Sequence, residues 1–369
     1  MQPIRDNSTQ IAPGPAVAAG NGESRPISGP VFVVGVWRSG TSLLYALLNQ
    51  HPQIALMYEG DLPLLWPLFI GRKLSSALCK WDFWNQALKR HALDSGELPD
   101  QGLDFRAAVE SVYSEYARRK GANIWGCKSP TYYDALPFLA QNFPAARFIV
   151  IWRHPAVVAG SILAAAETDA WFRRAGVMLR ALMGCRKLQL DGQRLALLGV
   201  RIHHVHYEGL VRDPATVMKG VCRFLEIPFD ARMVDLDTAD RSAVYGGEHH
   251  ALVHGSGIIR SRRRGRELPA TLRTKIDRYL RLWRQQFGSG SPLAAYVPEA
   301  DVVCASHWER ARDRGCFELL RALDRATRLT YCFTPLALWK AYRWLKSFFQ
   351  LPRKTVEVAT ITSPGLQHK

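Results

Sequence analysis

Residues 35–42 have the residue types and spacing of a loop that binds phosphate. Gly35 and Gly40 are separated by four residues, the spacing found in loops that bind nucleoside triphosphates. Glycines allow backbone amides to converge on an anion, and the start of a following helix adds partial positive charge. The lysine that follows the second glycine of a triphosphate loop is replaced here by Thr41, and the cation within the loop is Arg38. The sequence therefore favours a nucleotide without a γ-phosphate.

The segments on either side of this loop are those that a phosphate loop requires. Residues 31–36 are a short apolar, β-branched run, which predicts a buried parallel strand. Leucines recur at helical spacing from position 43 to the break at His51-Pro52, which predicts a helix. Residues 147–152 and 200–207 predict two further strands, and residues 214–225 another helix. Strands that alternate with helices indicate an α/β fold, a parallel sheet with helices on both faces.

The chain of 369 residues divides by composition into three parts. Residues 1–29 are rich in Pro, Gly, Ala and Ser without a hydrophobic period, so we expect a disordered N-terminal tail. Residues 30–288 contain the predicted sheet and form the main domain, in which residues 60–122 are expected to be helical and rich in aromatic side chains. Residues 289–369 are expected to form a C-terminal helical extension with a flexible end.

The sequence of the phosphate loop resembles that of a known family. Arg38-Ser39-Gly40-Thr41-Ser42, followed by a helix and His51-Pro52, is similar to the 5′-phosphosulfate loop of the sulfotransferases that use PAPS (3′-phosphoadenosine-5′-phosphosulfate) as donor. The similarity is to the branch that contains the protein-tyrosine sulfotransferases and many bacterial relatives. It covers residues 30–288 and implies a P-loop-containing sulfotransferase domain in which residues 38–42 bind the donor. Trp37 stands where the family often has proline.

The same resemblance implies a second anion site, for the 3′-phosphate of PAPS. Arg153 follows the predicted strand at 147–152, and Ser161 lies eight residues later. The family uses this pair to bind the 3′-phosphate, since arginine offers a bidentate contact that is always charged and the hydroxyl adds a donor.

Two further segments match the family around the nucleotide. Tyr207 opens a segment similar to the family's Tyr-Glu-x-Leu motif, which closes the sheet beside the nucleotide, and Glu226 after it stands where glycine is usual. The basic Gly/Ser segment 255–266 is similar in composition to the loop that covers the 3′-phosphate. Which arginine of 260–266 touches the donor stays open.

The resemblance also assigns the residues of an in-line sulfuryl transfer. Glu59 is implied as the general base that takes the proton of the acceptor. Lys128 and Arg38 are implied as the cations that stabilise negative charge on the departing phosphate. A histidine base, as in the cytosolic small-molecule sulfotransferases, is the alternative, with His249, His250 and His254 as candidates.

The bulk composition leaves two other classes of function to be considered. The net charge of +17 and the pI of about 9.8 favour anionic partners. A P-loop kinase of small molecules would need a lysine in place of Thr41 and a strand-end aspartate for magnesium, and neither is present. A nucleic-acid-binding protein would show aromatic residues among Lys and Arg in a recognisable motif, and we find none. We expect no metal ion as cofactor.

The acceptor and the cellular site are the least constrained features. The acceptor carries a hydroxyl or an amine, with a carbohydrate or a lipid-linked glycan favoured. The seven cysteines have no CxxC spacing, which favours buried thiols in a reducing compartment. We find no signal peptide or transmembrane segment, so a cytoplasmic protein is expected. Residues 335–349 predict an amphipathic helix with a basic side, which either packs on the domain or makes peripheral contact with an anionic membrane.

Overall fold

The computed structural model describes the sheet, the helices around it and parts of the C-terminal region. The described residues are 29–62, 87–94, 104–173, 176–246, 253–255, 267–297 and scattered positions between 306 and 341. The tail 1–28, the aromatic residues between positions 63 and 86, His249, His250, the basic residues 256–266 and most of 335–349 lie outside them.

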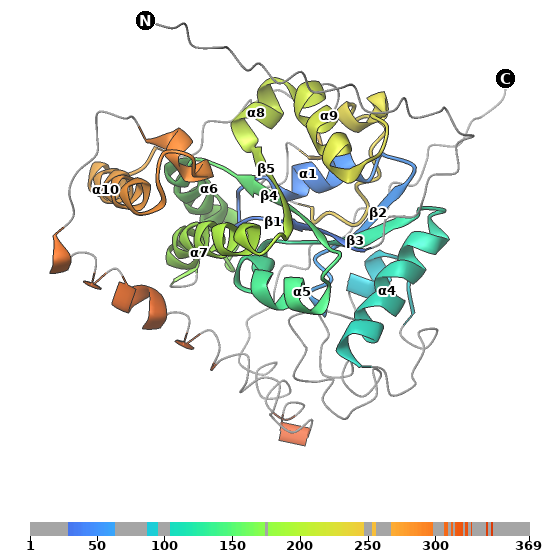
Figure 1. The fold of residues 1–369 in the computed structure, drawn as a ribbon, viewed down its shortest axis with the longest axis horizontal. Helices are drawn as coiled ribbons and strands as arrows, with labels where there is room; N and C mark the ends of the chain where they lie inside the picture. Colours follow the sequence, from blue (N-terminus) through green and yellow to red (C-terminus); the bar gives the residue numbers. More distant parts are fainter. Residues whose placement is uncertain are drawn as a thin grey trace, which may run out of the picture.

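Five parallel strands form one sheet in the order β2-β3-β1-β4-β5 (Figure 1). They are β1 Val31–Val34, β2 Ile54–Tyr58, β3 Ile124–Ser129, β4 Arg147–Trp152 and β5 Arg201–His206. The predicted strands at 31–36, 147–152 and 200–207 correspond to β1, β4 and β5, whereas β2 and β3 were not predicted. Lys128 lies inside β3 and pairs in register with Val33 of β1. The central strand β1 is fully buried between β3 and β4.

Helices cover both faces of the sheet, which confirms the predicted α/β class (Figure 1). The core under one face includes α4 Phe105–Arg119, α5 Leu136–Asn142, α6 Pro155–Thr168 and α7 Val177–Leu197. The core under the other face includes α1 Thr41–Leu48, α8 Tyr207–Arg212 and α9 Pro214–Leu225. Helix α10 Ala270–Phe287 packs against α6 and α7. Short 3-10 turns lie at η3 Pro130–Asp134, η4 Ala231–Val234 and η6 Pro292–Tyr296.

The predicted helix at 214–225 forms because both of its ends are specified locally. Asp213 accepts a hydrogen bond from the amide of Thr216, and Pro214 occupies the first turn. Glu226 ends the helix in the left-handed conformation, with φ of 61°, where the family usually has glycine. Its carboxylate pairs with the buried Arg147 at 2.8 Å. The turn is therefore preserved despite the unusual residue.

The C-terminal region is helical at the described positions 307–308, 311–312, 314–319, 322–323, 326, 337–338 and 341. Phe317 is buried, and the guanidinium of Arg186 on α7 lies 5.1 Å from the centroid of its ring. This part of the C-terminal region therefore packs on the main domain. Among the described residues, no helix is both long enough and apolar enough to cross a bilayer.

Because all five strands are parallel, their carboxyl ends meet at one edge of the sheet, where ligands bind in open α/β folds. The residues that follow the strands there include Arg38, Glu59, Arg153 and Tyr207, and Lys128 occupies the end of β3. The sequence singled out these side chains in five separate segments. The fold brings them together at one edge of the sheet.

Candidate active site

The phosphate loop is a tight turn between β1 and α1. Both the amide and the hydroxyl of Ser39 donate to the carbonyl of Val36, at 3.1 Å and 2.7 Å. Arg38 and Gly40 have positive φ angles of 68° and 103°. The amide of Leu44 donates to the carbonyl of Gly40, so the helical hydrogen bonds of α1 begin there. The amides of the preceding turn have no partner within the helix, which is the arrangement that binds phosphate groups.

Gly40 is required at its position for two independent reasons. Its φ angle is in the left-handed region, and a Cβ at this position would lie 2.4 Å from the Cδ2 atom of Tyr207. Tyr207 therefore packs directly on the loop backbone. This contact places the predicted nucleotide-site tyrosine beside the phosphate loop.

We expect Gly40→Ala to destabilise the protein by about 2 kcal/mol or more, because the left-handed strain adds to a steric clash. Gly121→Ala is the matched control, since Gly121 also has a positive φ, 68°, but its Cβ would meet nothing within 4 Å. The control should lose about 1 kcal/mol from strain alone. Thermal or urea unfolding of both variants measures the difference, and equal losses would contradict the packing of Tyr207 on Gly40.

Two half-buried arginines converge beside this loop. The Nε of Arg38 donates to the hydroxyl of Ser161 on α6 at 3.0 Å. Arg153 donates through Nη1 to the carbonyl of Arg38 at 2.8 Å, and its guanidinium lies 4.0 Å from the centroid of the Tyr207 ring. The Nε of Arg153 is buried and has no hydrogen-bond partner among the described residues. The structure thus brings together the four side chains of the predicted 3′-phosphate and loop sites.

The electrostatics of this arginine pair favour an anion. Burial, together with the nearby positive charge of Arg153, lowers the pKa of Arg38 to about 10. Two guanidinium groups held together in a half-buried position repel each other, and a bound phosphate would relieve both the repulsion and the unsatisfied N–H of Arg153. The arrangement therefore fits a ligand that carries an anionic group at this point.

Glu59 and Lys128 form an ion pair at the ends of β2 and β3. The Nζ of Lys128 lies 2.6 Å from Oε1 of Glu59. It also donates to the hydroxyl of Ser42 at 3.2 Å and lies 4.0 Å from the centroid of the Tyr58 ring. The side chain of Lys128 is 1% exposed and that of Glu59 is 16% exposed. The carboxylate is thus the more accessible member of the pair, and the ammonium connects it to the first turn of α1.

Tyr58, the last residue of β2, and the buried His91 fix the end of this strand, and the sequence did not single out either of them. The amide of Tyr58 donates to Nε2 of the buried His91 at 2.9 Å, and the hydroxyl of Tyr58 shares a hydrogen bond with that of Ser42 at 2.8 Å. Burial lowers the pKa of His91 to about 4, so the ring is neutral and accepts this hydrogen bond. Both residues fix the strand immediately before Glu59. Neither belongs to a local motif, because their contacts span 16 and 33 residues of sequence.

Trp37, the residue that departs from the family pattern, belongs to an aromatic cluster beside the loop. Its ring contacts Tyr133 and Trp171 at centroid distances of 5.6 and 5.3 Å, and Trp171 contacts Phe172 at 4.9 Å. The guanidinium of Arg38 lies 5.8 Å from the Phe172 ring. An apolar, ring-lined surface therefore adjoins the anion site.

The one described histidine among the alternative bases is His254. It is exposed, and its Nε2 hydrogen-bonds with the carbonyl of Tyr245 at 3.0 Å. No contact of His254 with Lys128 or Ser42 is found in the described part of the chain. Glu59, by contrast, contacts Lys128 directly.

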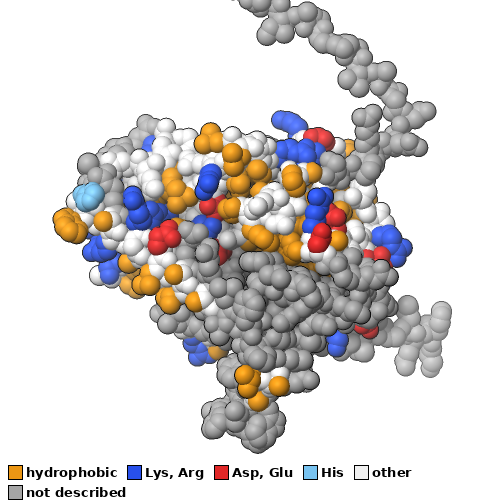
Figure 2. Space-filling model, turned by 60° about the horizontal axis from the view of Figure 1, so that its bottom comes forward, with side chains coloured by type: hydrophobic (Ala, Val, Ile, Leu, Met, Phe, Trp, Pro, Cys, Tyr) orange, Lys and Arg blue, Asp and Glu red, His pale blue; other side chains and the backbone are white. Residues whose placement is uncertain are grey.

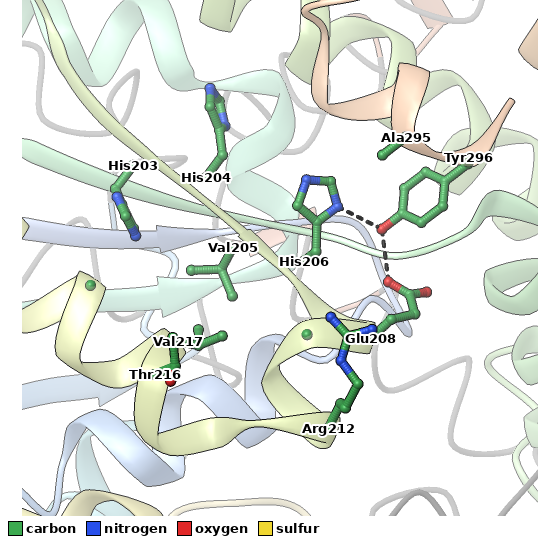
Figure 3. A pocket seen from close by; sticks show the side chains of 12 residues that line it. His203, His204, Val205, His206, Glu208, Arg212, Thr216, Val217, Ala295 and Tyr296 are labelled. Atoms are coloured by element: carbon green, nitrogen blue, oxygen red, sulfur yellow. Dashed lines mark hydrogen bonds between the residues drawn. The ribbon is translucent and has the colours of Figure 1, made fainter. Parts of the chain in front are cut away.

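A cavity of about 590 Å³ lies along the edge strand β5, between α9 and η6 (Figure 3). Within it, the hydroxyl of Tyr296 donates to Glu208 at 2.8 Å and hydrogen-bonds with Nδ1 of His206 at 3.0 Å. The other oxygen of Glu208 accepts from the amide of His154, the residue after Arg153. This network supports the end of β4, the strand that precedes Arg153.

Nowhere in the described ranges do three or more His, Cys, Asp or Glu side chains form a group that could hold a metal ion.

The fold and this edge define the class of protein: an α/β protein of the P-loop type, with two arginines beside the loop and Thr41 at the position of the usual loop lysine. The sequence profile of the sulfotransferase family matches residues 30–231. The chain therefore belongs to the sulfotransferase family, which confirms the resemblance seen in the sequence.

Several relatives and solved structures are similar to this chain. Protein-tyrosine sulfotransferase 1 of Danio rerio is 27% identical over 203 residues, which are 54% of each chain. The nodulation protein NoeE of Sinorhizobium fredii is 28% identical over 141 residues, 36% of this chain and 30% of that protein. The chain thus spans about half the length, or less, of these relatives.

Among solved structures, the sulfotransferase domain of the Synechococcus PCC 7002 olefin synthase has a TM-score of 0.47 at 21% identity, covering 72% of this chain and 96% of that domain. Mouse sulfotransferase SULT7A1 complexed with PAP has a TM-score of 0.42 at 14% identity, covering 73% of this chain and 89% of that protein.

Proposed function

We propose that this protein transfers a sulfuryl group from PAPS to a hydroxyl, or an amine, of an acceptor. The observation that carries this proposal is the convergence of the half-buried Arg38 and Arg153 with Ser161 beside a phosphate loop that lacks a lysine. PAPS carries two separate anionic groups, a 5′-phosphosulfate and a 3′-phosphate. The N-terminus of α1 supplies a site for the 5′-phosphosulfate. The nearby Arg153 and Ser161 supply a site for the 3′-phosphate.

The proposed donor contacts follow from this arrangement. Residues 38–42 hold the 5′-phosphosulfate through loop amides and the hydroxyls of Ser39, Thr41 and Ser42, while Arg153 and Ser161 hold the 3′-phosphate. Tyr207 packs between the loop and Arg153, and so keeps the two subsites at a constant separation.

The proposed mechanism is an in-line displacement at sulfur. Glu59 takes the proton from the acceptor while the acceptor oxygen or nitrogen forms a bond to sulfur. The bond between sulfur and the bridging oxygen of the 5′-phosphate breaks, and its electron pair stays on the phosphate. Lys128 and Arg38 stabilise that developing charge because they are already positioned, Lys128 fully buried and Arg38 half-buried. The products are the sulfated acceptor and adenosine 3′,5′-bisphosphate.

A transfer assay with PAPS labelled in its sulfuryl group tests this function. We expect label to move to at least one acceptor class in a panel of carbohydrates, lipid-linked glycans, tyrosine peptides and small phenols. The Glu59→Gln protein serves as the blank for each acceptor. A panel without transfer, from a protein that also fails to bind adenosine 3′,5′-bisphosphate, would contradict the proposal.

We expect Arg153→Ala to weaken binding of PAPS much more than binding of adenosine 5′-phosphosulfate, which lacks the 3′-phosphate. The loss for PAPS should be about 2 kcal/mol, the size expected for a charged hydrogen bond that is removed. Competition against labelled adenosine 3′,5′-bisphosphate measures both ligands. Equal losses for the two nucleotides would place Arg153 away from the 3′-phosphate.

The structure gives less support to the two alternative functions. A P-loop kinase would have a lysine after the second glycine of the loop, where this chain has Thr41. A nucleic-acid-binding protein would gather basic side chains into a stripe. On the face shown in Figure 2, the Lys and Arg side chains of the described residues are dispersed among acidic and hydrophobic ones.

For the acceptor, we propose a carbohydrate or a lipid-linked glycan as the first class to examine. The aromatic cluster around Trp37 adjoins the donor site and suits stacking on a sugar ring. The names of the protein-tyrosine sulfotransferases make peptide tyrosine the second class.

We also propose that the protein is cytoplasmic and that residues 335–349 make peripheral contact with a membrane. The free, buried thiols of Cys127, Cys185 and Cys222 are consistent with a reducing compartment.

A further inference from the structure

Tyr296 approaches the candidate active site from a part of the chain that the family profile does not cover. The profile ends at residue 231, and Tyr296 lies in η6, within the segment that the sequence assigned to the C-terminal extension. Its hydroxyl donates to Oε2 of Glu208 at 2.8 Å (Figure 3). Glu208 directly follows Tyr207, whose ring lies against the guanidinium of Arg153. The C-terminal extension therefore contacts the helix turn that packs beside the proposed 3′-phosphate site.

Glu208 holds the short connection between β4 and α6. Its Oε1 accepts a hydrogen bond from the amide of His154 at 3.0 Å, and His154 directly follows Arg153. The carbonyl and the ring of His154 both accept hydrogen bonds from amides in the first turn of α6. The amide of His154 is thus the group of this residue that depends on Glu208. Arg153 is held from two sides, by the ring of Tyr207 at its guanidinium and by the carboxylate of Glu208 at the following amide.

The hydrogen bond from Tyr296 fixes the orientation of the Glu208 carboxylate. Glu208 is half-buried, and the terminal torsion of a glutamate has a broad energy minimum. One hydrogen bond, from the amide of His154, would leave that torsion weakly defined. With Tyr296 as the second donor, each carboxylate oxygen has its own partner. Hydrogen bonds to a charged group are also stronger than those between neutral groups.

The position of Tyr296 is in turn fixed by its neighbours. Leu293, Ala294 and Val297 of the same segment are buried. The guanidinium of Arg284 on α10 donates to the carbonyl of Val297. Helix α10 packs against both η6 and α6, and α6 is the helix that follows Arg153. Continuous packing therefore connects the C-terminal segment with the proposed donor site.

The directions of the hydrogen bonds around Tyr296 can be assigned. Its hydroxyl has one hydrogen, which is donated to Glu208, and Nδ1 of His206 lies 3.0 Å from the same oxygen (Figure 3). Nδ1 must therefore carry a hydrogen and donate it to the hydroxyl oxygen. Burial raises the pKa of Tyr296 far above its ordinary value, so the hydroxyl keeps its hydrogen near pH 7.

We propose that Tyr296 is a positioning residue for the donor: through Glu208 and the amide of His154, it holds Arg153 where that arginine binds the 3′-phosphate. This inference rests on the proposed function of the same site. In this role Tyr296 touches neither the nucleotide nor the acceptor, and it takes part in no bond that forms or breaks. Its effect is therefore confined to nucleotides that carry a 3′-phosphate.

The test compares adenosine 3′,5′-bisphosphate with adenosine 5′-phosphate, which has the same nucleoside but no 3′-phosphate. Calorimetry at constant ionic strength measures both affinities in wild type, Tyr296→Phe and Tyr279→Phe. Tyr296→Phe removes the hydroxyl and keeps the ring. Tyr279→Phe is the matched control, because Tyr279 is half-buried on α10 against Trp283 and no hydrogen bond joins its hydroxyl to another described residue.

In Tyr296→Phe we expect the affinity for the bisphosphate to fall about tenfold, close to the smallest loss expected when a hydrogen bond to a charged group is removed. The affinity for adenosine 5′-phosphate should not change, and Tyr279→Phe should bind both nucleotides as wild type does. An unchanged affinity for the bisphosphate would overturn the proposal. An equal loss for the two nucleotides would also overturn it, because a general structural defect acts on both.

A double-mutant cycle shows whether Tyr296 acts through Arg153. In the Arg153→Ala background, Tyr296→Phe should cause no further loss of affinity for the bisphosphate, because the side chain that it positions is absent. The same tenfold loss in that background would contradict the proposed route through Arg153.

Nitrogen NMR of the wild-type protein tests the same contact without any variant. Burial lowers the pKa of His206, so its ring is neutral above pH 7. In protein labelled with ¹⁵N at the histidine rings, we expect the hydrogen of His206 on Nδ1. A hydrogen on Nε2 alone would mean that Tyr296 donates to His206 and not to Glu208, which would overturn the proposal. Failure of the proposed function is recognised separately, as a wild-type protein that does not bind the bisphosphate at all.

Discussion

In the Glu59→Gln protein, sulfuryl transfer from PAPS is expected to be slower by about 100-fold or more, the usual consequence of removing a general base. Binding of adenosine 3′,5′-bisphosphate should be retained, because the proposed donor contacts come from the phosphate loop, Arg153 and Ser161. The amide is close in size to the carboxylate and can still hydrogen-bond with Lys128. Single-turnover rates with bound PAPS, compared with calorimetric affinities, separate these two effects.

Glu226→Gln is a suitable control for the loss of one carboxylate. Glu226 ends α9 and pairs with Arg147 at the start of β4, the edge of the sheet opposite the active site. This variant should keep wild-type turnover. If Glu59→Gln also kept its activity while His254→Ala lost it, the role of the base would pass to the histidine.

The second large effect is expected at Arg38. Arg38→Ala should weaken binding of adenosine 3′,5′-bisphosphate by about 2 kcal/mol or more, because it removes a charged partner of a bound phosphate. It also removes the hydrogen bond that orients Ser161, so both proposed anion subsites lose a contact. Isothermal titration calorimetry at constant ionic strength measures the change.

Arg273→Ala is the matched control for the loss of one positive charge. Its side chain is 71% exposed on α10, so it contributes to the net charge of the protein but not to the site. The control should bind the bisphosphate as wild type does. Equal weakening in the two variants would mean that the general positive field, and not Arg38, accounts for nucleotide binding.

The strands that the sequence predicted are those whose local pattern agrees with their environment. The residues of β1 and β4 are apolar runs that are buried on both faces, as their burial confirms. Strand β2 is equally buried, but its residues Ile-Ala-Leu-Met-Tyr include three with good helix propensity and do not alternate. Strand β3 contains Gly126, Lys128 and Ser129, which resemble a loop in sequence. Both form because the neighbouring strands require partners, which is a tertiary effect.

The candidate site was predictable where its chemistry depends on sequence spacing. The loop 35–42 and its following helix are continuous in sequence, so the pattern was sufficient. The hydrogen bond between Arg38 and Ser161 joins residues 123 positions apart. It was not predicted, because the resemblance to a family had paired Ser161 with Arg153. The position of His91 beside Tyr58 depends on burial and on a single hydrogen bond across the fold, and no local pattern carries that information.

The most direct test of the account is the nucleotide preference of the purified protein. Calorimetric titration with adenosine 3′,5′-bisphosphate and, separately, with ATP and magnesium compares a ligand that has a 3′-phosphate with one that has a γ-phosphate instead. We expect the bisphosphate to bind at least tenfold more tightly, which corresponds to about 1.4 kcal/mol, and Arg153→Ala to abolish most of the difference. Equal affinities, or a preference for ATP, would contradict the assignment of PAPS as the donor.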